Sequence, residues 1–188
     1  MQFRKVIHIS GVLIPLLARE DILGKNQTIA LIIIGLVVYL TIEVLKPKIR
    51  KDLLSLVYRE NELSGFSSEP LSYILSVLWL LFLSYFIDEK ICYASIAILA
   101  AGDGFAGVMG RRYGKHRFWF NKNKSWEGSI SGLIAASVSG YYYAGPIALF
   151  GSVSGMMAGA VNKNDNIAVP LSAFAGMLLF QYVAGWMQ

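Results

Sequence analysis

The sequence contains a single cysteine, Cys92, and few charged residues, and each shortage excludes a class of protein. A lone cysteine cannot form a disulfide within the chain, so a fold held by internal disulfides is excluded. Charged residues make up only 15% of the 188 residues, whereas hydrophobic residues make up 55% and occur in long runs. This composition is too apolar for a soluble domain of this size and indicates an integral membrane protein.

The hydrophobic runs predict an all-α fold, a polytopic membrane bundle with about seven transmembrane helices. About 20 apolar residues are needed to cross the hydrocarbon core, and fewer suffice where other helices surround the segment. Residues 1–188 are expected to form one membrane-embedded domain. The expected spans are residues 6–18, 27–45, 71–87, 91–110, 128–142, 146–160 and 167–187.

The basic residues predict the orientation of this bundle. With the spans placed in order, only Arg19, Lys25 and Lys90 of the 17 Lys and Arg residues lie on one side. The positive-inside rule makes the other side, which includes the N-terminus, cytoplasmic. We therefore expect a multi-pass protein of the cell membrane, and the net charge of +5 does not indicate a nucleic-acid partner. The polar segments expected in the cytoplasm are the N-terminus and residues 46–70, 111–127 and 161–166.

The stretch from residue 100 to residue 131 carries most of the residues that point to chemistry. Asp103 lies between Gly102 and Gly104 inside an apolar run. The chain then enters a basic loop and returns to apolar sequence at Glu127. Cations suit phosphate oxygens and carboxylates suit a metal ion, so a basic loop between acids predicts a phosphate and magnesium site. The loop cations are Arg111, Arg112, Lys115, Arg117, Lys122 and Lys124.

The end of this loop has features of a helix start and of a phosphate site. Ser125 can cap the following helix, and Glu127 lies in its first turn, where the helix dipole favours an acid. Capping does not explain Lys124, and a helix N-terminus beside a lysine suits phosphate. Asp165 follows in the last cytoplasmic segment. Asp103, Glu127 and Asp165 are therefore candidate Mg2+ ligands, since Mg2+ is usually held by one or two carboxylates plus substrate phosphates.

Two patterns in this region resemble motifs that bind nucleotides or nucleic acids. Residues 102–107 read GDGFAG, which matches the dinucleotide fingerprint GxGxxG in letters, but no strand precedes it, so we reject that site. The loop 111–127 mixes cations with the aromatic residues Tyr113, Phe118, Trp119 and Phe120, and such a mixture can bind single-stranded nucleic acid. Next to a membrane, such a mixture more often contacts anionic headgroups and anchors the chain through its aromatic rings, and we prefer that interpretation.

Two ionisable residues within the expected spans leave alternatives open. His8 shares one side of a helix with Arg4 and Gly11, and a histidine there is more often packed and hydrogen-bonded than catalytic. Glu43 lies about one turn from Lys46. A functional role for Glu43 and its neutralisation by Lys46 are equally good interpretations.

Two further segments are interpreted as structural. Gly151, Gly155 and Gly159 are spaced by four residues, which indicates close helix packing. This packing is either within the chain or between copies, as in a homodimer. Residues 52–70 suggest a short surface helix followed by a turn.

Five segments of this sequence, in the expected order, resemble the dolichol kinase and phytol kinase family. Its members are integral membrane lipid kinases that use CTP. The central stretch is also similar to phosphatidate cytidylyltransferases. Those enzymes have a longer chain and a His-Gly-Gly element, which this sequence lacks. The matching segments are Arg4-Lys5-x-x-His8, Glu43, Gly102-Asp103-Gly104-x-Ala106 through Gly110 with Gly114-Lys115, Lys124-Ser125-x-Glu127-Gly128-Ser129, and Asp165-Asn166-x-x-Val169-Pro170.

The resemblance implies a CTP-dependent kinase that transfers the γ-phosphate to the hydroxyl of a membrane isoprenoid alcohol at the cytoplasmic face. The acceptor is open among dolichol, a shorter polyprenol, geranylgeraniol, phytol and diacylglycerol. One alternative is a cytidylyltransferase that makes a CDP-activated lipid. The other is a non-enzymatic transporter or assembly subunit, which the lack of an internal repeat disfavours.

The resemblance also implies roles for individual residues. The expected catalytic residues are Asp103, Lys124, Asp165 and His8, and the base is open among Asp103, Asp165 and His8. The expected metal is Mg2+, held by Asp103, Glu127 and Asp165. The residues expected to bind CTP are Gly102, Gly104, Gly107, Arg111, Arg112, Lys115, Lys124, Ser125, Glu127 and Asn166.

Overall fold

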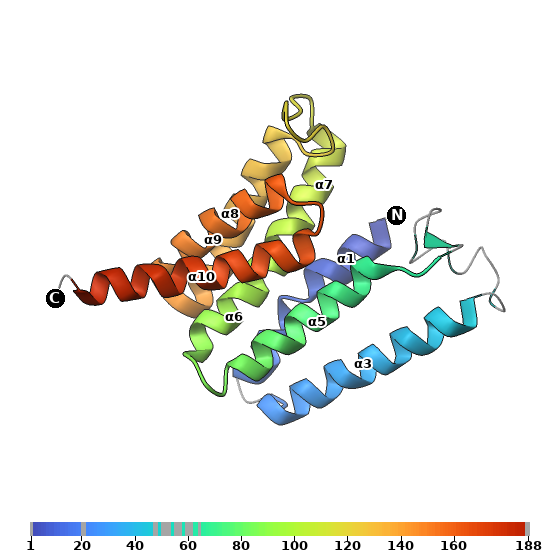
Figure 1. Cartoon of the computed structure of the whole chain (residues 1–188), viewed down its shortest axis with the longest axis horizontal. Helices are drawn as coiled ribbons and strands as arrows, with labels where there is room; N and C mark the ends of the chain where they lie inside the picture. The colour runs from blue at the N-terminus through green and yellow to red at the C-terminus, as the bar shows by residue number, and fades with distance from the viewer. Residues whose placement is uncertain are drawn as a thin grey trace.

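The computed structural model describes residues 2–19, 22–46, 49, 54, 58, 62, 63 and 65–186. These residues form helices joined by short loops, with no strand among them, so the all-α prediction is confirmed. The structure does not describe residue 187 of the last expected span, nor nine residues of the segment 52–70 expected to form a short surface helix and a turn, namely 52, 53, 55–57, 59–61 and 64. The elements in Figure 1 are α1 (Gln2–Ser10), α2 (Leu13–Arg19), α3 (Lys25–Leu45), α5 (Ser68–Leu83), α6 (Glu89–Ala97), the π-helix η3 (Ile98–Asp103), α7 (Gly104–Tyr113), α8 (Trp126–Ala144), the 3-10 helix η4 (Gly145–Ile147), α9 (Ala148–Val161) and α10 (Asp165–Trp186).

The centre of the bundle is α6 together with η3. Every residue from 91 to 104 is buried. Helices α5, α8 and α10 pack around this segment, and α2 and α9 also touch α6. A helix that is apolar on all sides is stable when other helices enclose it. The buried segment ends at Asp103, so the fold carries a carboxylate to the edge of its core.

Helices α8 and α9 form an antiparallel hairpin. Gly145 at the turn has a φ of 61°, in the left-handed region that favours glycine. Gly132 of α8 lies against Met156 of α9, and Gly140 lies against Ala148. The residue number of the α9 neighbour falls as the residue number of the α8 glycine rises, so the two helices run in opposite directions. The expected spans at 128–142 and 146–160 are therefore two separate helices.

The glycine stripe of α9 packs within the chain. A Cβ at Gly155 would lie 2.9 Å from the carbonyl oxygen of Val169, and one at Gly151 would lie 2.8 Å from Met177. Both neighbours belong to α10. The stripe therefore packs α9 against α10. The glycines that suggested a homodimer are in contact within the chain, so they do not support a homodimer.

The first expected span, residues 6–18, is broken into α1 and α2. Pro15 lacks an N–H and cannot continue the hydrogen-bond ladder to Gly11. The Tyr73 hydroxyl lies where a side chain at Gly11 would be, and it donates to the carbonyl of His8 at 3.1 Å. Pro15 of α2 and Tyr73 of α5 thus account for the break.

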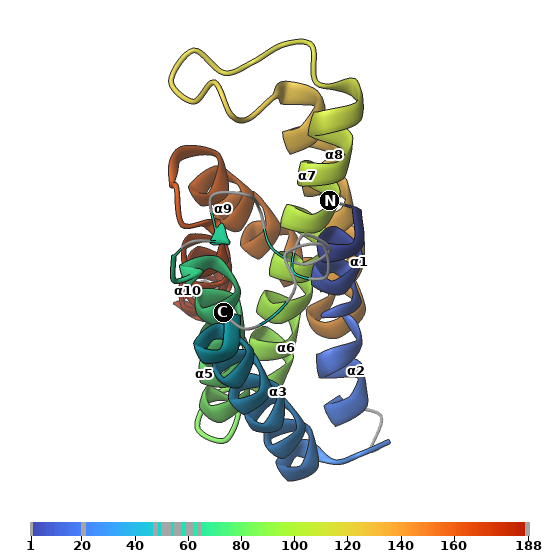
Figure 2. The same cartoon turned by 90° about the vertical axis from the view of Figure 1, so that its right-hand side faces the viewer.

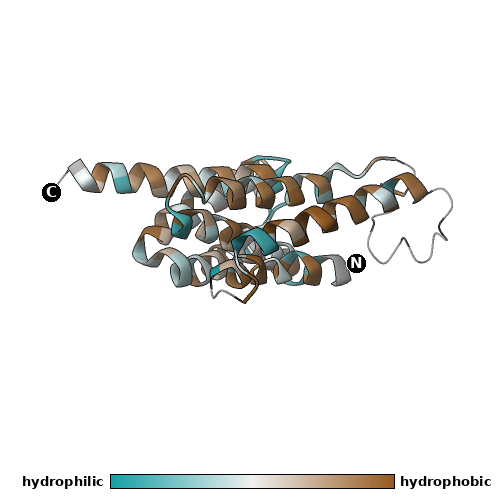
Figure 3. Ribbon diagram, turned by 90° about the horizontal axis from the view of Figure 1, so that it is seen from below, coloured by the Kyte–Doolittle hydropathy of each residue, from teal (hydrophilic) through white to brown (hydrophobic). Residues whose placement is uncertain are grey.

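Several helices are suited to a lipid environment. Among the described residues, four segments are long and apolar enough to cross a membrane, and α5 is shorter. Figure 3 shows that apolar residues dominate the long helices. Along α3, Ile34, Val37 and Val38 are each more than half exposed. Apolar side chains exposed along whole helices fit contact with lipid rather than water. The four segments are Lys25–Leu45, Glu89–Tyr113, Trp126–Val161 and Asp165–Gly185.

Candidate active site

A cavity of about 530 Å³ lies among the ends of α1, α5, α7, α8 and α10 and beneath the loop from α7 to α8. Figure 2 shows this loop and the ends of α7 and α8 projecting beyond the other helices. The lining is mainly polar and carries both signs of charge. Its cations are Lys5, Arg111, Arg117, Lys124 and Lys163, and its acids are Glu69, Asp103 and Asp165.

Asp103 is the most enclosed acid of the cavity. It ends the π-helical segment η3, and π-helical turns occur frequently at functional sites. Its side chain is 9% exposed, so its charge requires partners. Oδ2 lies 2.9 Å from Nζ of Lys5 and 3.4 Å from Nε2 of His8, and Oδ1 lies 3.7 Å from Nζ of Lys124. Asp103 therefore faces α1 with one oxygen and the α7–α8 loop with the other.

Lys124 connects Asp103 to Asp165. Its ammonium also donates a hydrogen bond to Oδ2 of Asp165, at the start of α10. Burial opposes the charge on Lys124, but the nearby carboxylates of Asp103 and Asp165 outweigh it and raise the pKa of Lys124 above its usual value. Lys124 is therefore a stable cation between two carboxylates. The structure brings together Asp103, Lys124, Asp165 and His8, the four expected catalytic residues.

Local hydrogen bonds hold Lys124 in place. Ser125 caps α8, since its Oγ accepts from the backbone N–H of Gly128 at 3.2 Å, as the sequence predicts. The N–H of Phe118 donates to the carbonyl of Lys124 at 3.2 Å, across the base of the loop. A Cβ on Gly128 would lie only 2.8 Å from Gly110 and Ala106 of α7. This close approach of α7 and α8 sets the loop over the cavity.

Glu127 is not brought together with Asp103 and Asp165. Its carboxylate lies 2.7 Å from Nδ1 of His116 and accepts from the His116 backbone N–H at 3.1 Å. It does not line the cavity. In this structure Glu127 holds the two ends of the loop together.

The expected nucleotide-binding residues divide into two groups. Gly107, Arg111, Lys124, Ser125 and Asn166 line the cavity. The others lie outside the lining. Gly102 packs against Met156, and Gly104 packs against Ile9. Arg112 and Lys115 are exposed, and Glu127 is half-buried beside His116.

Some cavity residues were not assigned from the sequence. Lys5 and His8 are three residues apart on α1, which puts them on one helix face. The sequence pattern groups His8 with Arg4 and Gly11 instead, and the spacing of three residues between Lys5 and His8 is the signal that this grouping omits. Glu69 and Lys163 are next to helix ends and have no pattern that marks them, and only the packing places them here.

Glu43 lies outside the cavity lining. Its Oε1 lies 2.6 Å from Nζ of Lys46, and both side chains are 5% exposed. Lys46 also donates to the carbonyls of Glu62 and Gly65 and to Oγ of Ser67. The alternative in which Lys46 neutralises Glu43 is confirmed.

The acids present fit Mg2+ only if the substrate supplies further oxygens. Among the described residues, no three His, Cys, Asp or Glu side chains lie close enough to hold a metal by themselves. Asp103 and Asp165 both reach the same ammonium, so a small cation near that point can contact both carboxylates. Two carboxylates plus phosphate oxygens and water are a usual ligand set for Mg2+.

Comparison with known proteins identifies relatives of the chain. It is 32% identical to a protein from Oryza sativa named probable phytol kinase 1, chloroplastic, over 67% of this chain and 46% of that protein. It is 33% identical to the farnesol kinase, chloroplastic, of Arabidopsis thaliana, over 59% of this chain and 42% of that one. It is 30% identical to phytol kinase 1, chloroplastic, of Arabidopsis thaliana, over 69% and 49%.

Three further results of the comparison concern length, solved structures and family. It spans about half the length of the curated relatives it matches. No solved structure matches it significantly. The sequence model of the cytidylyltransferase family matches residues 4–184, nearly the whole chain. This chain therefore belongs to the cytidylyltransferase family.

Proposed function

We propose that this protein is a CTP-dependent kinase that phosphorylates the hydroxyl of a membrane isoprenoid alcohol of the phytol or farnesol type. The observation that carries the proposal is the partly buried chain of charges Lys5–Asp103–Lys124–Asp165 at the rim of a membrane bundle. The names of the relatives, phytol kinase and farnesol kinase, support the same chemistry.

The cavity has the charges that phosphoryl transfer requires. Protein catalysis of this reaction consists mainly of positioning and charge stabilisation. Lys124, Arg117 and Lys163 would neutralise the phosphate oxygens of CTP. Asp103 and Asp165 would hold Mg2+, which supplies positive charge at the phosphates.

The proposed reaction forms one bond and breaks one. The oxygen of the alcohol attacks the γ-phosphorus, and a new O–P bond forms. The bond between the γ-phosphorus and the oxygen that bridges it to the β-phosphate breaks, and CDP leaves. The hydroxyl proton passes to a side chain of the cavity, for which Asp103, Asp165 and His8 are the candidates, and then to water.

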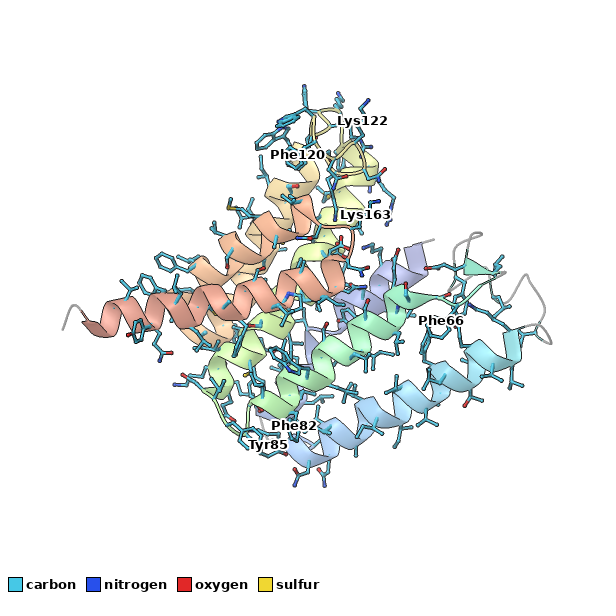
Figure 4. All side chains as sticks on the ribbon, viewed as in Figure 1. Phe66, Phe82, Tyr85, Phe120, Lys122 and Lys163 are labelled. Atoms are coloured by element: carbon cyan, nitrogen blue, oxygen red, sulfur yellow. The ribbon has the colours of Figure 1, made fainter. Side chains whose placement is uncertain are left out.

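We propose that residues 1–188 act as one catalytic domain that crosses the cell membrane seven times, with the cavity on the cytoplasmic face. Figure 4 supports a common side for the polar segments. Phe120, Lys122, Lys163 and Phe66 lie toward one end of the bundle, and Phe82 and Tyr85 lie at the other. Lys163, a cation of the cavity, thus lies toward the end that the positive-inside rule would make cytoplasmic.

A second candidate is a cytidylyltransferase, because the matching family carries that description. It would attach CMP to a lipid phosphate and release pyrophosphate from the same nucleotide. The two functions differ in the bond of CTP that breaks. Release of CDP with γ-phosphate on the lipid indicates a kinase, and release of pyrophosphate indicates a cytidylyltransferase.

The deciding experiment uses the purified chain in detergent with CTP, Mg2+ and either phytol or farnesol. CTP labelled at the γ-phosphate is expected to label the alcohol. Asp103→Asn should lower this transfer by about 100-fold or more, while the protein keeps its thermal unfolding midpoint within a few degrees. A parallel reaction contains a lipid phosphate in place of the alcohol. Release of pyrophosphate with a CDP-lipid in that reaction, and no labelled alcohol in the first, would overturn the kinase assignment. Near-normal transfer by Asp103→Asn would overturn the role of this carboxylate.

A further inference from the structure

The two oxygens of Asp103 divide the cavity into two sides. Oδ2 faces α1, where it lies near Lys5 and His8. Oδ1 faces Lys124, which links it to Asp165 of α10. In a transfer between two substrates, the donor and the acceptor lie on opposite sides of the transferred group. The two oxygens of Asp103, the most buried acid of the cavity, face two such sides.

The side toward α10 and the loop suits a nucleotide that arrives from water. Arg117, Asn123 and Lys163 line it, and all three are exposed. Cations and amides in contact with solvent favour a highly charged triphosphate. Other polar residues on this side are already engaged: Asn121, for example, donates to the carbonyl of Ala160.

The side toward α1 and α5 has a different character. Its polar lining includes His8 and Glu69. A carboxylate such as Glu69 repels a triphosphate but accepts a hydrogen bond from a neutral hydroxyl. Tyr73 of α5 holds this wall in place, since its ring centroid lies 4.3 Å from that of His8 and its hydroxyl bonds to the His8 carbonyl.

Exposed apolar residues flank the α1–α5 side. On α1, Val6 and Ile7 are 61% and 48% exposed, next in sequence to the cavity residues Lys5 and His8. Phe66, just before α5, is 60% exposed. A lipid alcohol must present its hydroxyl to a polar site while its chain stays in apolar surroundings. This side of the cavity offers both.

We propose that the α1–α5 side of the cavity is the acceptor subsite, in which His8 and Glu69 bind the hydroxyl of the lipid alcohol while the nucleotide occupies the α10 side. The assignment rests on the proposed kinase function and adds the arrangement of its two substrates. Asp103 then lies between the two substrates, near the phosphorus that is transferred.

The test measures KM for each substrate separately, with phytol and CTP as probes. His8→Asn and Glu69→Gln should each raise the KM for phytol about tenfold and leave the KM for CTP within about twofold, because each weakens the hydrogen bonds proposed for the acceptor and leaves the cations proposed for the nucleotide in place. Lys163→Ala should do the reverse. Ser10→Ala is the matched control, since Ser10 is exposed on α1 and bonds to the carbonyl of Ile7 in its own helix.

The outcomes distinguish a wrong subsite assignment from a wrong proposed function. If wild-type protein phosphorylates phytol but His8→Asn and Glu69→Gln raise the KM for CTP, or change neither KM, the subsite assignment is wrong and the kinase stands. If wild-type protein phosphorylates neither phytol nor farnesol, the proposed function itself fails. A variant without measurable transfer is tested for its thermal shift with CTP and Mg2+: a retained shift supports the acceptor subsite, and a lost shift overturns it.

Discussion

The ammonium of Lys124 donates a hydrogen bond to the carboxylate of Asp165, although 41 residues separate the two in the sequence. The same ammonium lies 3.7 Å from Asp103. One lysine thus neutralises two partly buried acids and holds the end of the α7–α8 loop against the start of α10. In the proposed function, this lysine would contact phosphate instead when a nucleotide and its metal bind.

Lys124→Ala should lower kcat/KM for CTP by about 100-fold or more, because a partly buried cation that would neutralise phosphate charge is lost. Lys122→Ala is the matched control: Lys122 is an exposed lysine of the same loop and does not line the cavity. Steady-state kinetics with γ-labelled CTP measures both. Equal losses in the two variants would show that the loop contributes only general positive charge.

Asp165→Asn and Glu127→Gln should separate a metal ligand from a loop contact. Asp165→Asn is expected to raise the Mg2+ concentration for half-maximal activity at least about tenfold, since a carboxylate ligand is lost. Glu127→Gln should leave that concentration unchanged and raise the KM for CTP a few-fold, since it weakens the bond to His116. A Mg2+ titration at fixed CTP gives both values. If Glu127→Gln strongly raised the Mg2+ concentration for half-maximal activity, Glu127 would be a metal ligand after all.

Lys46→Met should destabilise the protein by about 3–5 kcal/mol, because it leaves the buried carboxylate of Glu43 without its cation. The double variant Glu43→Gln with Lys46→Met should be more stable than Lys46→Met alone, since no unpaired charge remains. Thermal unfolding in detergent compares the two. A double variant that unfolds earlier than the single one would contradict this role for Lys46.

Gly155→Ala should destabilise the protein by about 1–3 kcal/mol, because its methyl group would lie 2.9 Å from the carbonyl oxygen of Val169. Gly35→Ala in α3 is the control, because no atom of the described residues lies within 4 Å of the added Cβ. This control should be neutral or slightly stabilising, since alanine favours a helix over glycine. Thermal unfolding of both variants tests whether close packing, rather than glycine itself, matters at position 155.

Much of the site could be predicted from the sequence because its pieces have local signals. Asp103 stands in an apolar run, Ser125 begins a helix and Asp165 begins the next polar return, so all three were expected on one side of the membrane. Lys5 and Glu69 were not assigned, because a residue joins a cavity through packing between helices and not through its neighbours in sequence. Glu127 was grouped with the other acids for its type and side, but its direction depends on His116.

The helical, membrane-embedded class follows from the amino-acid sequence alone, since the length of an apolar run decides whether a helix can leave water. The start of α8 follows from it too, through capping at Ser125. Three features required the folded chain: the packing of the α9 glycines on α10, the break of the first span at Pro15 and Tyr73, and the link from Asp103 through Lys124 to Asp165. Helix formation depends on residues a few positions apart, whereas the pairing of helices depends on surfaces that meet only when the chain has folded.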